Sequence, residues 1–226
     1  MLTFIIKICW MKYIHKDHLK EPISLREFRE TTPNANYLGL HGDVKETLRL
    51  ILLEEQGFLC AYCMGRISND RNNMEIEHYV TQKRHLNSPF SEQEHKDQEL
   101  RYLNMLGTCN GLRSCSGIRG NKPLVVDPKK TDCEQLVKFR KDGSAYSDDL
   151  NVMNDIEQLE LNKLADARSA VIDKARERLK KHQNWSNNII EKEINNWKSK
   201  KKTRYGLAYE PYCMAAVHYL ESKKKN

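Results

Sequence analysis

The residue types best suited to chemistry lie in one stretch of the chain, residues 60–121. Two cysteine pairs there enclose a carboxylate, the histidine directly after it and an asparagine, and a second asparagine follows the last cysteine. Thiolates in such pairs suit a tetrahedral zinc site, whereas a carboxylate, an imidazole and amide oxygens suit metal-assisted hydrolysis of a phosphodiester. The residues concerned are Cys60, Cys63, Glu77, His78, Asn104, Cys109, Cys115 and Asn121.

The four cysteines form a C-x2-C pair, Cys60 and Cys63, and a looser C-x5-C pair, Cys109 and Cys115. Four thiolates around one Zn²⁺ would hold two distant turns together and add to the folding free energy directly. The alternative is that one or more are free core cysteines. Two pairs flanking the Glu-His and Asn residues are more specific than one pair, so we predict a structural zinc ion. The remaining thiols are interpreted as ordinary buried or free ones: Cys9, Cys133 and Cys213.

His78 is the candidate general base, because a neutral imidazole can take a proton from a water that then attacks phosphorus. Its position directly after Glu77 on an apolar strand, between the cysteine pairs, distinguishes it from the other histidines. Adjacent strand residues point to opposite faces. The two side chains can therefore converge on one metal only if the strand ends or twists there.

Three oxygen-bearing side chains complete the candidate set. Glu77 is a hard ligand for Mg²⁺ or Mn²⁺; the alternative, a solvated strand carboxylate, fits Glu75 better. Asn104 sits in an apolar frame and would need partners if buried, either holding the backbone or ring of His78 or serving as a simple turn residue. Asn121 either completes the divalent-metal site or only forms a turn.

Local patterns predict the elements that position these residues. An amphipathic helix is expected over residues 43–56, with Asp43 as N-cap and Gly57 ending it. A short hairpin over residues 58–67 would carry the first cysteine pair in its turn. A strand over residues 74–80 would then deliver the Glu-His pair.

The remaining patterns are less regular. Residues 82–101 are polar without a period and are predicted to be a loop, and residues 134–153 a small hairpin. Helical patterns follow over residues 159–182, 187–202 and 209–222. One more short helix is suggested near the start by Leu25, Phe28 and Arg29, and a basic run near the end comprises Lys198, Lys200, Lys201, Lys202 and Arg204.

Bulk composition sets broader limits. The 226 residues suffice for one large domain or a small core with an appendage, and we divide the chain into residues 1–42, 43–128 and 129–226. With 39% hydrophobic and 31% charged residues, the chain is expected to be soluble. A net charge of +7 fits a polyanionic partner such as a nucleic acid, although ordinary proteins share such a surplus.

The apolar start of the chain, residues 1–10, is too short to span a bilayer and lacks the flanks of a signal peptide. Met11 would also serve as a start, so the sequence allows these ten residues to be an extension rather than part of the fold. We therefore expect a cytoplasmic protein with no membrane partner. In that compartment cysteines are metal-bound or free rather than disulfide-paired.

The motifs resemble a known family. The chain is similar to the HNH endonucleases of Septu-type and retron-associated anti-phage defence operons, the PtuB-like proteins. The resemblance covers most of the chain from Met11, and its most specific part is the run from Leu-Glu-Glu-Gln, residues 53–56, to Cys-Ala-Tyr-Cys, residues 60–63. It also includes residues 76–79, 102–107 and 120–124.

This resemblance implies an α+β protein with a ββα-metal core and a structural zinc on the four cysteines, flanked by an N-terminal helix and a mostly helical C-terminal region. His78 would be the general base, oriented by Asn104. Glu77 and a residue after the last cysteine would hold the catalytic Mg²⁺ or Mn²⁺. That residue is usually acidic, Asn or His, but here it is Ser116. We therefore favour Asn121 as the second ligand and keep Ser116 as the alternative.

The resemblance also implies partners. Family members work with an ABC/SMC-type ATPase, the PtuA-like protein, and in some operons with a reverse transcriptase and its noncoding RNA. The expected function is a metal-dependent nuclease that acts as a toxic effector. The alternatives are a zinc-stabilised nucleic-acid-binding module without catalysis and a scaffold whose helical C-terminal part binds a partner.

Overall fold

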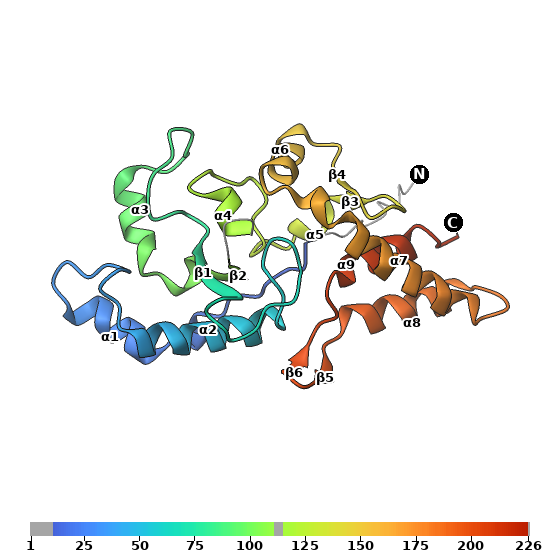
Figure 1. Ribbon diagram of the computed structural model, residues 1–226, viewed down its shortest axis with the longest axis horizontal. Helices are drawn as coiled ribbons and strands as arrows, with labels where there is room; N and C mark the ends of the chain where they lie inside the picture. Colours follow the sequence, from blue (N-terminus) through green and yellow to red (C-terminus); the bar gives the residue numbers. More distant parts are fainter. Residues whose placement is uncertain (1–10, 111–114, 226) are drawn as a thin grey trace, which may run out of the picture.

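The computed structural model of the protein describes residues 11–110 and 115–225 (Figure 1). Over these residues the fold is α+β, with helices and three separate two-stranded antiparallel sheets. The class predicted from the sequence is thereby confirmed. The ten residues that the sequence allowed to be an extension, Cys9 among them, lie outside the described residues.

Two predicted helices form in the N-terminal part. The elements there are η1 (His18–Lys20), α1 (Ile23–Thr31) and α2 (Gly42–Gln56). As predicted, α2 ends at Gly57, which adopts a left-handed conformation with φ 58°. The predicted N-cap is wrong, because His41 occupies that position. Asp43 instead lies in the first turn, where its carboxylate accepts a hydrogen bond from the Val44 amide at 2.9 Å and favours the helix dipole.

The central sheet pairs β1 (Met74–His78) with β2 (Met105–Cys109). At the end of α2, the buried Gln56 amide donates to the Gly107 carbonyl at 2.8 Å and accepts from the Gly107 N–H at 2.7 Å. The Ala61 N–H donates to the same carbonyl at 3.0 Å. A Cβ at position 107 would lie 2.6 Å from the terminal methyl of Met74 on β1, so a larger residue there would require this flexible side chain to move. These bonds hold α2 and the first cysteine turn against β2.

The predicted loop over residues 82–101 contains a helix, so that prediction is wrong in its second half. Helix α3 (Glu92–Glu99) starts with a capping box: the Ser91 side chain accepts from the Glu94 amide, and the Glu94 carboxylate accepts from the Ser91 amide. The Ser-x-x-Glu spacing is the sequence pattern of a capping box and could have predicted where this helix begins. The helix lacks an apolar stripe, and its buried residue is His95, so hydrophobic periodicity could not reveal it.

Short elements make up the middle of the chain. They are η2 (Tyr102–Asn104), α4 (Cys115–Arg119), α5 (Cys133–Leu136), β3 (Lys138–Phe139), β4 (Ala145–Tyr146), α6 (Leu150–Gln158) and η3 (Leu161–Leu164). The predicted hairpin over residues 134–153 exists only as the β3–β4 pair, and helices occupy both ends of that range. The predicted hairpin over residues 58–67 is reduced to one bridge between Leu59 and Arg66.

The C-terminal part is mostly helical, as predicted. Its elements are α7 (Ala165–Lys180), α8 (Asn187–Lys198), β5 (Lys201–Thr203), β6 (Gly206–Ala208) and α9 (Cys213–Glu221). The helix predicted over residues 187–202 stops at Lys198, because the chain turns extended at Ser199 and then folds back at Gly206, whose φ is 107°. The basic run therefore forms a hairpin rather than a helix face.

The core extends through both parts of the molecule. Helix α9 is buried along almost its whole length and packs against α7 and α8, and these three helices stand together at one end of the molecule (Figure 1). Helices α1 to α4 and the β1–β2 sheet occupy the other end, and the β5–β6 hairpin projects from the body. Over the described residues, none of the helices has the length and apolarity needed to cross a bilayer.

Candidate metal and catalytic site

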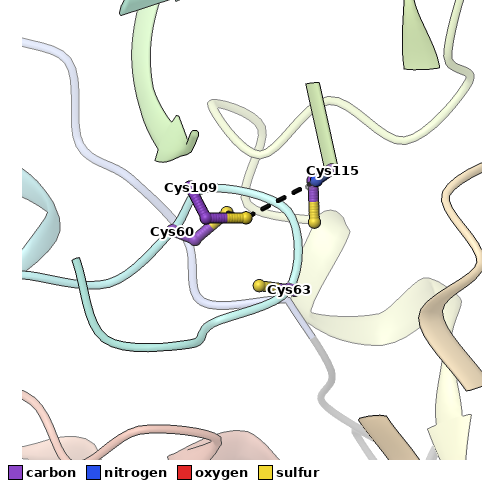
Figure 2. A group of neighbouring side chains, drawn as sticks. All are labelled: Cys60, Cys63, Cys109 and Cys115. Atoms are coloured by element: carbon purple, nitrogen blue, oxygen red, sulfur yellow. Dashed lines mark hydrogen bonds between the residues drawn. The ribbon is translucent and has the colours of Figure 1, made fainter. Parts of the chain in front are cut away.

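The four predicted cysteine ligands form a cluster (Figure 2). The sulfur atoms of Cys60, Cys63, Cys109 and Cys115 all lie within 4.8 Å of one another. Three of the residues are buried, and Cys109 is half-buried. The cluster could therefore hold a metal ion such as zinc, which is the part of the cofactor prediction that the structure supports.

Three separate segments bring the sulfurs together. Cys60 and Cys63 occupy the turn closed by the Leu59–Arg66 bridge, Cys109 ends β2, and Cys115 begins α4. Backbone amides point at two of the sulfurs: Gly65 N–H donates to Cys63 Sγ at 3.4 Å, and Cys115 N–H donates to Cys109 Sγ at 3.5 Å. Such N–H···S contacts favour thiolates, the form that binds metal.

The donor set fits zinc in distance and in charge. Four sulfurs about 2.3 Å from a tetrahedral Zn²⁺ lie about 3.8 Å apart, and Cys60 Sγ is 3.7 Å from Cys109 Sγ. Hydrogen bonds from the neighbouring thiols, that of Cys115 first, lower the pKa of Cys109, whereas burial raises the pKa of Cys60. Four thiolates cannot share so small a buried space without a cation.

A buried arginine from the C-terminal part stands near this cluster. Arg168 on α7 is fully buried and donates to the carbonyls of Gly143 and Leu161 at 2.7 Å and 2.6 Å. Its Nη1 atom has no hydrogen-bond partner, and its charge interacts with Cys63 and Cys115. A zinc ion with four thiolates carries a net charge of −2, which this guanidinium would partly offset.

Two further described cysteines lie apart from the cluster, in agreement with the prediction of free thiols. Cys133 and Cys213 are fully buried and unpaired. Burial raises the pKa of Cys213 to about 12, so its thiol is protonated at neutral pH. Neither residue belongs to the group that could hold a metal.

A second feature lies at the end of β1, where Glu77 and His78 line a cavity of about 350 Å³. The strand ends at His78, which satisfies the condition under which both side chains can reach one site. Asn121 lines the same cavity, whereas Ser116 does not. A larger cavity of about 600 Å³ between α1 and α3 contains none of the predicted site residues.

His78 is held in one tautomer. Its Nε2 lies 2.9 Å from the carbonyl oxygen of Glu99, and since a carbonyl only accepts, Nε2 carries the proton. Nδ1 is then the unprotonated nitrogen. Burial lowers the pKa of His78 to about 4, so the ring is neutral at physiological pH. The ring of Tyr37 packs edge-on against it, with centroids 4.7 Å apart.

Glu77 uses one of its two oxygens in contacts with the protein. Its Oε1 accepts hydrogen bonds from Arg119 at 2.5 Å and from the Tyr62 hydroxyl at 3.5 Å. Its Oε2 has no partner among the described hydrogen bonds and is not one of the fully buried atoms. Burial raises the pKa of Glu77, and Arg119 opposes that rise. One oxygen of the carboxylate is therefore anchored, and the other has no described hydrogen-bond partner.

Arg119, which the sequence analysis did not single out, connects the two features. Its fully buried guanidinium lies at the end of α4, the helix that begins with Cys115. It makes five hydrogen bonds, to Tyr62 Oη, Glu77 Oε1 and the carbonyls of His78, Tyr79 and Lys122. The helix that carries a cysteine ligand thus fixes the end of β1, where the candidate base lies.

Asn104 is buried, and its described hydrogen bonds go to residues other than His78. Its side chain accepts from the Val80 amide at 2.8 Å and donates to the carbonyls of Val80 and Gln98 at 2.8 Å and 3.1 Å. It therefore fixes the segment just after His78, whereas the sequence analysis had it holding His78 itself. The backbone carbonyl of Asn104 accepts from the Tyr79 amide at 2.9 Å. The effect on the histidine is indirect.

The two candidates for the second ligand differ in surroundings. Asn121 is exposed beside the cavity, just after Gly120, whose φ is 55°. Ser116 is buried in α4, where its hydroxyl lies 3.4 Å from the Cys109 carbonyl. Of the two, only Asn121 lines the cavity.

The cavity has further polar lining that the sequence analysis did not assign. Glu75 was interpreted as a solvated strand residue, but it is half-buried in the cavity wall. Burial, with the nearby charge of Glu77, raises the pKa of Glu75 to about 7. Arg49 and Arg71 also line the cavity. Because side chains alternate along β1, the two glutamates lie on one face of the strand. This alternation could have predicted that Glu75 lies near Glu77 in the cavity.

No protein-family model matches this chain, and no curated protein matches it significantly.

We expect Arg119→Met to lower the free energy of unfolding by about 3–5 kcal/mol, because it leaves the carboxylate of Glu77 buried without its partner. Chemical denaturation measures the effect. Arg176→Met is the matched control, since Arg176 pairs with Asp173 on the exposed face of α7 at 2.7 Å and should cost less than about 1 kcal/mol. Equal losses in the two variants would contradict the anchoring role of Arg119.

Proposed function

We propose that the protein is a metal-dependent endonuclease of the HNH type, which hydrolyses phosphodiester bonds in nucleic acid. The observation that carries this proposal is the neutral, tautomer-fixed His78 beside the half-anchored carboxylate of Glu77, both lining one cavity. The antiparallel β1–β2 pair followed by α4 has the order of a ββα core. The cysteine cluster links the turn before β1, the end of β2 and the start of α4.

In this proposal His78 is the general base. Its Nε2–H is committed to the Glu99 carbonyl, so Nδ1 accepts the proton of the attacking water. The proton stays on the imidazole as the water oxygen attacks phosphorus and the leaving oxygen departs. Tyr37 and the Glu99 carbonyl restrain the ring, and Asn104 restrains the backbone after it.

The residues that would hold the catalytic ion are Glu77, through Oε2, and Asn121, through its amide oxygen. Both are hard oxygen donors of the kind that Mg²⁺ and Mn²⁺ prefer. When bound there, such an ion would stabilise charge that develops on the phosphoryl oxygens. Arg119 would keep Glu77 ionised and oriented toward the cavity.

One observation favours a second candidate, a zinc-stabilised nucleic-acid-binding protein without catalysis. The ion pair between Glu77 and Arg119 is equally consistent with a purely structural role for Glu77. A binding module, however, has no need of a neutral histidine with a free ring nitrogen at a cavity. Geometry therefore favours the enzyme.

The biological role in this proposal is that of an anti-phage effector working with an ABC/SMC-type ATPase, in some operons together with a reverse transcriptase and its noncoding RNA. This part rests on the sequence motifs from Met11 onward, above all on residues 53–63.

The test is cleavage by the purified chain, with and without a PtuA-like ATPase, on single- and double-stranded DNA and RNA. The expected result is cleavage that requires Mg²⁺ or Mn²⁺ and stops with EDTA. Nucleic-acid binding without cleavage under every condition would support the binding module instead. Absence of both would refute the proposal.

Between the two candidate second ligands, we expect Asn121→Ala to raise the Mg²⁺ concentration required for cleavage, and Ser116→Ala to leave it unchanged. The reason is that Asn121 borders the cavity while Ser116 does not. Cleavage rates measured across a Mg²⁺ titration report the difference. The reverse ranking would assign the second ligand to Ser116.

A further inference from the structure

The basic run near the C-terminus forms a hairpin with two distinct faces. Lys202 pairs with Leu207 across the β5–β6 register, and Lys201 pairs with Ala208. Paired residues share a face. Ala208 is buried and Lys201 lies over the Trp197 ring, so that face contacts the protein body. Lys202 and Leu207 therefore face outward, and Leu207 is 65% exposed.

The hairpin is held firmly at its base. The Lys200 ammonium donates to the Glu54 carbonyl at the end of α2 at 2.6 Å, and the Tyr209 amide donates to the Gly57 carbonyl at 3.0 Å. Arg66 donates to the Tyr209 carbonyl and lies over the ring of Tyr205. These bonds connect the hairpin to the segment just before the cysteine turn.

The outward cations lack acidic partners. The hairpin and its flanks, residues 198–209, contain no aspartate or glutamate. Lys202 and Arg204 are exposed, and neither makes an ion pair within the described part of the chain. Several lysines of the C-terminal part are paired by contrast: Lys174 with Glu210, Lys180 with Glu177, and Lys224 with Glu191 and Glu221.

From this arrangement we propose that the outer face of the β5–β6 hairpin binds the phosphate backbone of the nucleic-acid substrate. The inference rests on the proposed function, because it assigns a surface to the substrate of that site. A projecting, anchored hairpin with unpaired cations complements a polyanion, and the exposed Leu207 can contact sugars or bases between phosphates.

The test measures binding separately from cleavage. The protein carries His78→Ala, the buffer contains no added Mg²⁺ or Mn²⁺, and the probes are fluorescein-labelled duplex DNA, single-stranded DNA and RNA. Lys202→Glu with Arg204→Glu should weaken the best-bound probe at least tenfold. The magnitude of the slope of log K against log salt should fall by about 1.8 on duplex DNA, two phosphate contacts at about 0.9 each, or by about 1.4 on a single strand, at about 0.7 each. Zinc content and melting temperature show that the variant is folded.

The matched control reverses the same number of charges elsewhere, at Lys130 and Lys141, which are exposed and lie away from the hairpin. Its affinity and salt slope should stay close to those of the parent protein.

Equal behaviour of the hairpin and control variants overturns the proposal. So does a hairpin variant that keeps its nucleic-acid affinity but loses the ATPase, which would make the hairpin a protein-docking surface. If the parent binds and the hairpin variant does not, the hairpin proposal stands even where no cleavage is seen.

Discussion

We expect that replacing Cys109 with serine abolishes zinc binding and unfolds the region around β1 and β2. This is the largest effect that we expect on the fold, because Cys109 contributes its sulfur from the end of β2 to a site that also joins the first cysteine turn and α4. Binding of zinc by a structural site contributes on the order of 10 kcal/mol to folding in small domains. A serine hydroxyl cannot replace a thiolate ligand.

Elemental analysis and thermal melting measure this prediction. Wild-type protein should contain one zinc ion per chain, and a strong chelator should lower its melting temperature. Cys133→Ser is the control: Cys133 is more deeply buried than Cys109, and its thiol lies 3.6 Å from the Met11 carbonyl, but it is outside the cluster. That variant should keep its zinc. A wild-type protein without zinc, or Cys109→Ser melting like wild type, would rule out the structural metal.

Local patterns predicted those features that local chemistry decides. The periodicity of residues 43–56 and the glycine after them predicted α2 to within one residue. The strand that carries Glu77 and His78 was also predicted, and it ends two residues earlier than expected. The cysteine spacing predicted the cluster, because a C-x2-C turn and a second pair of thiolates have little use apart from each other.

Features that depend on tertiary contacts could not be predicted from the sequence. Nothing local marks Arg119 as buried, since four of its five hydrogen bonds go to Tyr62 and to residues 77–79, which are distant from it in sequence. The hairpin at residues 201–208 reads as the continuation of a helix rich in lysine. Its formation depends on the turn at Gly206 and on anchoring to α2 through Lys200.

Replacing His78 with alanine should reduce cleavage by about 10²–10⁴-fold, the usual contribution of a general base, while the protein stays folded and zinc-loaded. The side chain makes one hydrogen bond, to the Glu99 carbonyl, and water in the adjoining cavity can replace that donor. Since the pKa of His78 is lowered to about 4, its ring is unprotonated across the physiological range and available as a base. Its loss therefore removes proton transfer rather than a charge.

Two further variants separate a catalytic from a structural role. His78→Gln can still donate to the Glu99 carbonyl but cannot serve as the base, so it should be as inactive as His78→Ala and more stable. His218→Ala is the matched control, because burial also lowers the pKa of His218 to about 4 and its Nδ1 accepts from the Phe139 amide at 3.3 Å, yet it does not line the cavity. It should cleave like wild type. If His78→Gln retained wild-type turnover, the proton would have to be taken by another group, and Glu75, whose pKa is raised to about 7 in the same cavity, would be the residue to test next.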